Sequence, residues 1–214
     1  MIPATDALER LRTGNLHYVS GVRSIDALLS QVNRSTLVDA QFPFAVILGC
    51  SDSRVPVEIV FDQGVGDLFV IRVAGNVVAP SQIGSVEFAV ERYGTRLVVI
   101  LGHTRCGAVE ATLEELRQPS DRRSPNLKPI VDRVRPAVEA LLDTDLSKDP
   151  VALMENAVRA NIRMSANMLR HGSTVIERLI DSGELLVVGA EYSLETGIVD
   201  FFDGMPELQA SPRE

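Results

Sequence analysis

The sequence predicts an α/β fold, with a mostly parallel four-stranded sheet, an antiparallel edge strand, flanking helices and an N-terminal helical arm. Short runs of β-branched and other apolar residues end in glycine, which is typical of buried parallel strands followed by tight turns. Helical patterns separate these runs, and such a β-α-β alternation indicates parallel pairing with right-handed crossovers. The last apolar run follows a short turn, so we expect it to pair antiparallel with the strand before it.

The predicted arm comes first. Apolar residues such as Leu8 and Leu11 recur at helical spacing over 5–20, which predicts an amphipathic helix that Gly21 ends. Residues 24–40 have the pattern of one or two further short helices. From these residues the arm is expected to be helical and apolar on one side.

Strands and helices alternate after the arm. Parallel strands are predicted near 44–49, 68–72, 97–101 and 185–191, and an antiparallel strand over 197–202. Helices are predicted near 56–62, 81–93, 106–118, 127–142, 151–170 and 174–182. Since no segment has the composition of a linker, we expect one domain over 1–214, with the arm at 1–40, the α/β core at 41–204 and a tail at 205–214.

The charge balance limits the possible partners. The chain has 21 Lys and Arg against 29 Asp and Glu, for a net charge of −8, and its basic residues form no dense cluster. Nucleic acids and anionic membranes are bound through clustered cations, so we expect neither as a partner. No apolar stretch approaches the roughly 20 residues of a membrane span. The first residues lack the basic and apolar regions of a secretory signal, so we expect a cytoplasmic protein.

Each of the two cysteines lies in a pattern typical of metal ligands. Cys50 begins the segment Cys-Ser-Asp-Ser-Arg directly after the apolar run that ends at Gly49, and Cys106 belongs to His-Thr-Arg-Cys-Gly, which begins at His103 after another such run. Because the carboxyl ends of neighbouring parallel strands meet at one edge of a sheet, we expect the two segments to lie together. Two thiolates, an imidazole and the carboxylate of Asp52 suit Zn²⁺ better than other common metals.

The two segments resemble the signature motifs of the bacterial β-class carbonic anhydrases. The likeness extends beyond the metal ligands, because Gln41 and Pro43 precede the first strand as a Gln and a Pro do in that family. The stretches 66–76 and 85–90 are similar to the family's second strand and next helix. The resemblance is dense over roughly residues 40–110 and looser in the flanking sequence.

The resemblance implies an enzyme that reversibly hydrates CO₂ to bicarbonate and a proton, with one Zn²⁺ per chain. Cys50, His103 and Cys106 would bind the metal, which would lower the pKa of a water in its fourth position so that hydroxide attacks CO₂. Asp52 and Arg54 would form the catalytic dyad, in which the guanidinium orients the carboxylate and keeps its pKa low. In a closed, inactive form known in the family, Asp52 itself would occupy the fourth position.

The resemblance also implies residues that line the substrate cleft. Gln41, Phe69 and Gly102 would surround CO₂, with an amide donor for one oxygen and apolar walls for an uncharged substrate. In the family this cleft lies at a dimer interface, so Gln41 and Phe69 could serve the metal of the neighbouring subunit. We therefore expect a homodimer or a homotetramer.

Some family members have a regulatory bicarbonate pocket built from a Trp, an Arg and a Tyr. Arg72 and Tyr192 match the Arg and the Tyr, whereas Ile47 stands in the place of the Trp. We therefore expect closure by Asp52, if it occurs, to depend mainly on pH. Arg72 has an alternative role as the partner of an acidic residue, with the candidates Glu58, Asp62 and Asp67.

Two other functions are compatible with the same motifs. One is a zinc hydrolase that acts on CS₂ or COS, and comparing the turnover of these substrates with that of CO₂ would identify it. The other is a non-catalytic, zinc-stabilised regulatory protein, which would bind zinc without hydrating CO₂. An Asp52–Arg54 pair beside the metal argues against this last function, because a structural zinc site is closed and does not need such a pair.

Overall fold

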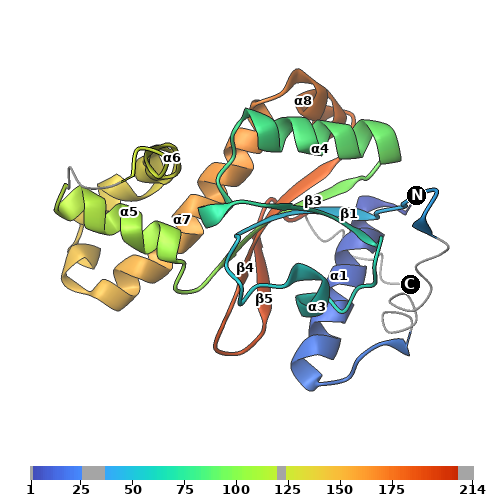
Figure 1. The fold of residues 1–214 in the computed structure, drawn as a ribbon, viewed down its shortest axis with the longest axis horizontal. Coiled ribbons are helices and arrows are strands. Elements are labelled where there is room, and N and C mark those ends of the chain that lie inside the picture. The colour runs from blue at the N-terminus through green and yellow to red at the C-terminus, as the bar shows by residue number, and fades with distance from the viewer. Residues whose placement is uncertain (1, 26–36, 120–123, 207–214) are drawn as a thin grey trace, which may run out of the picture.

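The computed structural model describes residues 2–25, 37–119 and 124–206 (Figure 1). Its strands are β1 (Ala45–Gly49), β2 (Leu68–Arg72), β3 (Leu97–His103), β4 (Leu186–Tyr192) and β5 (Val199–Asp203). Its α-helices are α1 (Ala4–Ser20), α3 (Val57–Val60), α4 (Pro80–Tyr93), α5 (Gly107–Arg117), α6 (Lys128–Val138), α7 (Pro150–His171) and α8 (Thr174–Asp181). Short 3₁₀ helices are η2 (Ala74–Asn76), η3 (Glu139–Asp143) and η4 (Asp145–Lys148).

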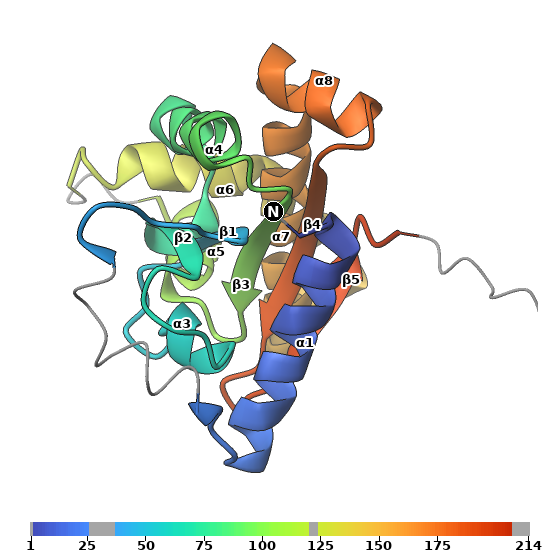
Figure 2. The same ribbon diagram turned by 90° about the vertical axis from the view of Figure 1, so that its right-hand side faces the viewer.

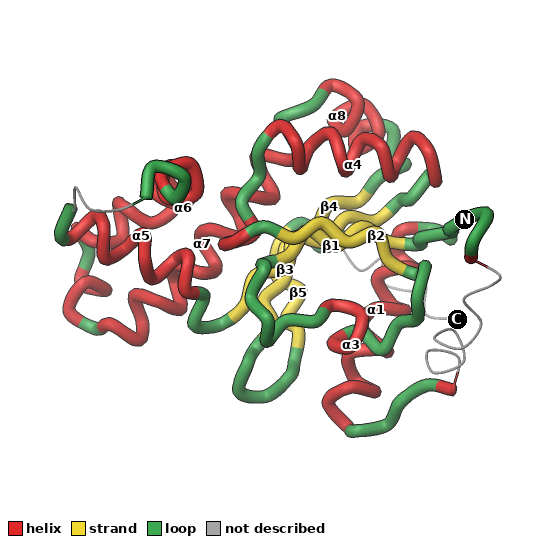
Figure 3. Tube along the Cα trace, in the orientation of Figure 1, coloured by secondary structure: helices red, strands yellow, loops and turns green. Residues whose placement is uncertain are grey.

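The strands form a single central sheet in the order β2-β1-β3-β4-β5 (Figure 3). The strands β2, β1, β3 and β4 are parallel, and β5 pairs antiparallel with β4. The predicted fold class is therefore confirmed. The last strand is Val199–Asp203 rather than 197–202. Its pairing is irregular, because the successive residues Gly189 and Ala190 of β4 lie opposite Asp203 and Phe201, which leaves Phe202 of β5 as an extra residue.

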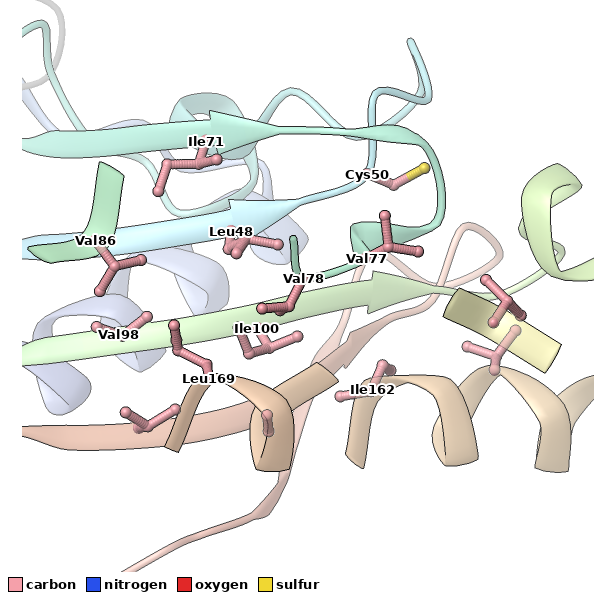
Figure 4. Packing of buried hydrophobic residues seen from close by; sticks show 14 of the residues in the cluster. Leu48, Cys50, Ile71, Val77, Val78, Val86, Val98, Ile100, Ile162 and Leu169 are labelled. Carbon is pink, nitrogen blue, oxygen red and sulfur yellow. The ribbon is translucent and has the colours of Figure 1, made fainter. Parts of the chain in front are cut away.

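Helices cover both faces of the sheet, which explains why its strands are almost continuously apolar. Helices α4, α7 and α8 lie on one face, and α1 and α3 lie on the other (Figures 1 and 2). In β1, Val46 and Leu48 belong to the core cluster on the first face, whereas Ala45 and Ile47 belong to the cluster on the second. Cys50 continues the first of these rows, at the carboxyl end of the strand (Figure 4). Each fully buried Leu or Ile on these faces contributes about 1.5–3 kcal/mol, so the edge that carries Cys50 rests on a well-packed scaffold.

Two elements differ from their predicted bounds for identifiable reasons. The strand predicted over 97–101 extends to His103, because His103 lies opposite Tyr192 in the ladder with β4. The helix predicted over 127–142 is α-helical only to Val138 and continues as the 3₁₀ helix η3. Pro136 lies in its last turn and has no N–H to donate, which weakens the α-helical ladder there.

Backbone conformation accounts for several helix ends. Gly21 ends α1 with φ of 72° and Gly94 ends α4 with φ of 62°, both in the left-handed region that glycine adopts readily. The helix predicted over 56–62 covers only Val57–Val60, and Asp62 has a left-handed φ of 48°. Most of the short helices predicted within 24–40, and most of the predicted tail, lie outside the described residues. Among the helices of the described segments, none is long and apolar enough to cross a membrane.

Candidate metal centre

Cys50, His103 and Cys106 come together at the carboxyl edge of the sheet. Cys50 follows β1, His103 is the last residue of the neighbouring strand β3, and Cys106 is the N-cap of α5. One possible ligand atom from each residue lies within 4.8 Å of the others, and all three residues are buried. The two Sγ atoms are 4.0 Å apart, about twice the length of a disulfide bond, so both thiols are free to bind a metal.

The orientation of the His103 ring leaves one nitrogen for a metal. Nδ1 lies 2.9 Å from the backbone oxygen of Thr104. A carbonyl oxygen only accepts, so Nδ1 carries the proton and Nε2 presents its lone pair. Nε2 is buried and has no hydrogen-bond partner in the described structure. A buried orphan nitrogen is costly unless something binds it, and a metal ion beside two thiols would do so.

The electrostatics of the two cysteines also fit a cation. The hydrogen bond from the Cys106 thiol is the main reason why the pKa of Cys50 is lowered. The N–H of Gly75, 3.3 Å from Cys50 Sγ, lowers this pKa further, whereas burial acts in the opposite direction. The same contact and burial raise the pKa of Cys106. These opposite shifts show that two thiolates in contact disfavour each other. A divalent ion would stabilise both as thiolates.

Asp52 lies beside these ligands and is held by Arg54. Arg54 Nε donates to Asp52 Oδ1 at 2.9 Å, Arg54 Nη2 donates to Oδ2 at 2.7 Å, and the backbone N–H of Arg54 donates to Oδ1 at 2.9 Å. These hydrogen bonds hold the pKa of Asp52 well below its usual range. Asp52 Oδ2 is 3.8 Å from His103 Nε2, so a carboxylate with a fixed orientation faces the ligand set. Asp52 is therefore paired with Arg54 in this structure.

Arg72 holds the backbone that carries the first motif. Its Nε donates to the carbonyl oxygen of Cys50 at 3.0 Å and its Nη2 donates to that of Asp52 at 2.6 Å. Two of the acidic partners considered for it are engaged elsewhere, because Asp62 pairs with Arg23 and Asp67 pairs with Arg10. The hydrogen bonds of Arg72 therefore indicate that it fixes the motif loop, a role that neither interpretation of the sequence included.

Tyr192 does not lie beside Arg72. It is buried on β4, and its hydroxyl is 3.1 Å from the hydroxyl of Tyr18 in α1. The strands β1 and β3 separate β4 from β2, which carries Arg72. With strands about 4.8 Å apart, the two backbones are about 14 Å from one another. A regulatory role for the pair remains a prediction.

The predicted substrate residues lie in two other places. Gln41 Nε2 donates to the Tyr93 hydroxyl at 2.9 Å, and the Phe69 ring lies 6.1 Å from the Tyr93 ring, so both residues gather against α4 and away from the ligands of their own chain. Gly102 faces α7, where a Cβ would lie 2.5 Å from the Ile162 side chain. In the isolated chain, Gly102 therefore allows β3 to pack closely against α7.

Comparison with known proteins identifies the family. The family model described as carbonic anhydrase matches residues 45–199. The carbonic anhydrase of Mycolicibacterium smegmatis is 36% identical over 194 residues, which cover 91% of each chain. The solved structure of the β-carbonic anhydrase CcaA matches with a TM-score of 0.72 and 25% identity, covering 94% of each chain. The chain belongs to the β-carbonic anhydrase family.

Further relatives agree with this assignment. Carbonic anhydrase 2 of Mycobacterium tuberculosis is 37% identical over 193 residues, with 89% of each chain covered. The β-carbonic anhydrase CafA of Aspergillus fumigatus has a TM-score of 0.71 and 27% identity, covering 84% of this chain and 85% of that one. This chain is therefore an enzyme of the carbonic anhydrase type, a family whose reaction is the hydration of CO₂.

The structure adds two residues to this carbonic anhydrase site that sequence reasoning missed. The N–H of Gly75 donates to Cys50 Sγ. Gly75 has a φ of 69°, and a Cβ added at this position would lie 3.0 Å from the side chain of Ala108. The Gly between a predicted strand and a predicted helix is the only signal for it. Thr104 contributes its backbone carbonyl to His103, and no side-chain pattern reveals such a contact.

Proposed function

We propose that this β-carbonic anhydrase is a zinc enzyme that reversibly hydrates CO₂ to bicarbonate and a proton, with one Zn²⁺ per chain. Cys50, His103 and Cys106 would hold the ion. The observation that carries the proposal is the convergence of two free thiols on the Nε2 of a buried histidine. This nitrogen has no hydrogen-bond partner among the described residues, and the other ring nitrogen is already hydrogen-bonded.

The donor set favours zinc over other common metals. Thiolates are soft ligands and imidazole suits zinc, whereas Mg²⁺ and Ca²⁺ prefer oxygen ligands. Three protein ligands leave a fourth tetrahedral position open, as in catalytic rather than structural zinc sites. When bound, zinc acts as a Lewis acid that lowers the pKa of a coordinated water and so supplies a nucleophile at neutral pH.

Asp52 would orient the attacking water. Its carboxylate faces the ligand set, 3.8 Å from His103 Nε2, and can accept a hydrogen bond from that water. Such a bond would direct a lone pair of the water oxygen toward the carbon of CO₂. This orientation of the reacting atoms would lower the barrier to attack. Arg54 keeps the carboxylate ionised and in place through three hydrogen bonds, so Asp52 remains an acceptor.

We further propose that the face carrying Gln41 and Phe69 contacts a second copy of the chain and completes that copy's substrate cleft. Two exposed side chains support this location. Phe42 is 79% exposed and Phe88 is 52% exposed, which is unusual for aromatic side chains. The Phe88 ring packs against both Phe69 and Tyr93, and β2 is an edge strand of the sheet. In such a homodimer, or in a homotetramer of such dimers, Gln41 and Phe69 would line the substrate cleft of the neighbouring chain.

Stopped-flow hydration of CO₂ from pH 6 to 9 tests the proposal, with zinc measured in the same sample. We expect activity that scales with zinc content. CS₂ and COS are run in parallel. A zinc-loaded protein that turns over these substrates but not CO₂, or that turns over none of them, would contradict the proposed function.

A further inference from the structure

The turn between β4 and β5 is fastened to the second metal-binding motif. Glu195 in this turn accepts a hydrogen bond from the Thr104 hydroxyl at its Oε2, at 2.8 Å. Its other oxygen, Oε1, lies 2.7 Å from Arg105 Nε. The Thr104 hydroxyl in turn accepts from the Leu194 N–H at 3.0 Å. One carboxylate therefore holds two consecutive residues of the segment between His103 and Cys106.

Both of these residues support the site through their backbone carbonyls. The carbonyl of Thr104 accepts from His103 Nδ1 at 2.9 Å, and that of Arg105 accepts from Arg54 Nη2 at 3.4 Å. The first contact sets which ring nitrogen of His103 is free for a metal, and the second is an additional anchor for the guanidinium that holds Asp52. Glu195 is thus linked through one residue to the histidine ligand and through the next to the dyad.

The segment also has a conformation that needs outside support. Arg105 has φ of 54°, in the left-handed region that residues with a Cβ adopt only at a cost. Such a conformation persists where neighbouring groups hold it. The Thr104 N–H donates to the Tyr192 carbonyl at 3.0 Å and holds the start of the segment. Glu195 holds the side chains of Thr104 and Arg105 in this segment.

We propose that Glu195 is a positioning residue for the metal centre, which sets the orientation of His103 and of Arg54 through Thr104 and Arg105. The inference rests on the proposed function, because it takes Cys50, His103 and Cys106 as ligands of a catalytic metal. An exposed ion pair by itself contributes little to stability, so the expected effect is on the ligand geometry rather than on the fold.

Glu195→Ala tests this role, with Glu184→Ala as the matched control. Glu184 is a similarly exposed glutamate whose ion pair with Arg96 lies away from the site. Each protein is measured for zinc affinity by competition with a chelator, for the visible spectrum of its Co²⁺-loaded form, and for its melting temperature. Replacing residues that support metal ligands typically lowers metal affinity by about 10–100-fold. For Glu195→Ala we expect about a tenfold loss of zinc affinity and a changed Co²⁺ spectrum. Its melting temperature should be like that of the control.

Variants of Thr104 separate positioning from a general loss of stability. Thr104→Ser keeps the hydroxyl and is expected to retain zinc affinity. Thr104→Val removes the contact with Glu195 but leaves that of Glu195 with Arg105, so it should lose zinc affinity by less than Glu195→Ala. The double variant Thr104→Val with Glu195→Ala should lose less than the two single losses combined, because both act on the same contact. Should Glu195→Ala melt much earlier than the control, Glu195→Gln provides the test, since it keeps an acceptor for Thr104 and is expected to fall between the wild type and Glu195→Ala.

The inference is overturned if Glu195→Ala binds zinc as tightly as the wild type and leaves the Co²⁺ spectrum unchanged. A full additive loss in the double variant would also contradict it. These readouts do not depend on turnover. If the wild type binds zinc but does not hydrate CO₂, the proposed function fails while the positioning role of Glu195 is still decided by affinity and spectrum.

Discussion

Arg54 binds both carboxylate oxygens of Asp52, its neighbour two residues earlier, and so fixes that carboxylate toward the metal-binding side chains. The fork geometry of the guanidinium makes this possible, because two parallel N–H groups match two oxygens. Asp52 Oδ2 lies 3.8 Å from His103 Nε2, which places an ionised acceptor beside the ligand set.

Replacing Arg54 by Lys should impair catalysis without removing the metal. A lysine ammonium is a point charge and cannot hold both oxygens of Asp52 in parallel. If Asp52 orients the attacking water, we expect a fall in kcat/KM of about 100-fold, within the range typical of positioned acid–base groups. Stopped-flow kinetics and zinc content measure the two effects separately. Arg12→Lys, at an exposed ion pair with Glu9, is the control and should retain full activity.

Asp62 should make the stability of the fold depend on pH at the acidic end. Its side chain is buried, which by itself would raise the pKa of this carboxyl, but hydrogen bonds from the Ser24 N–H, Arg23 and His17 outweigh burial and lower it. Because its pKa is lower in the folded state, the ionised carboxyl stabilises the fold at pH values above its unfolded-state pKa of about 4. This stabilisation is lost as the pH falls through the folded-state pKa.

The corresponding measurement compares the wild type with Asp62→Asn by denaturant unfolding at pH 7 and at successively lower pH. We expect the variant to be less stable by about 1–3 kcal/mol at pH 7, and the difference to shrink below about pH 4. Asp145→Asn, at an exposed pair with Lys148, should show almost no difference at any pH. A difference for Asp62→Asn that stays constant down to pH 2 would refute the assignment.

Gly102→Ala should destabilise the fold through its contact with α7. The added Cβ would lie 2.5 Å from the side chain of Ile162, and overpacking of this kind typically costs about 1–3 kcal/mol. Gly84→Ala is the control, because a Cβ there meets nothing within 4 Å. Combining Gly102→Ala with Ile162→Val should restore part of the loss, as thermal unfolding would show. If Gly102→Ala is as stable as the control and raises only KM, the predicted substrate-lining role is favoured instead.

Phe88→Glu should disrupt assembly if the face beside Gln41 and Phe69 contacts a second chain. Burying a new carboxylate in an apolar interface is unfavourable, so light scattering should report a lower molar mass than for the wild type. Activity should fall with it, because each cleft would lose the residues of its neighbour. Leu127→Glu is the control at another exposed apolar residue. An unchanged mass and full activity would place the interface elsewhere.

Much of the fold could be predicted from the sequence because the sheet is covered on both faces. Its strands are therefore apolar runs that stand out from amphipathic helices such as α1 and α4, and the paired cysteine motifs follow directly after two of them. The break of the helix at Val138 was missed, because apolar spacing continues past Pro136 and masks the missing hydrogen bond.

The supporting contacts of the site could not be predicted in the same way. The partners of Arg72 are backbone carbonyls of Cys50 and Asp52, and the partner of His103 Nδ1 is the carbonyl of Thr104. Every residue has a carbonyl, so the side-chain sequence gives no sign of which one is used. Glu195 lies far from the motif in the chain, and only the pairing of β3 with β4 brings its turn to the metal centre.

Zinc titration of the metal-free enzyme tests the central claim most directly. We expect CO₂ hydration to rise linearly and to saturate at one zinc per chain. His103→Ala should bind zinc far more weakly and show no such rise, whereas His171→Ala, at an exposed histidine paired with Glu177, should behave like the wild type. Saturation at one zinc per chain with unimpaired activity in His103→Ala would contradict the assignment of this metal centre.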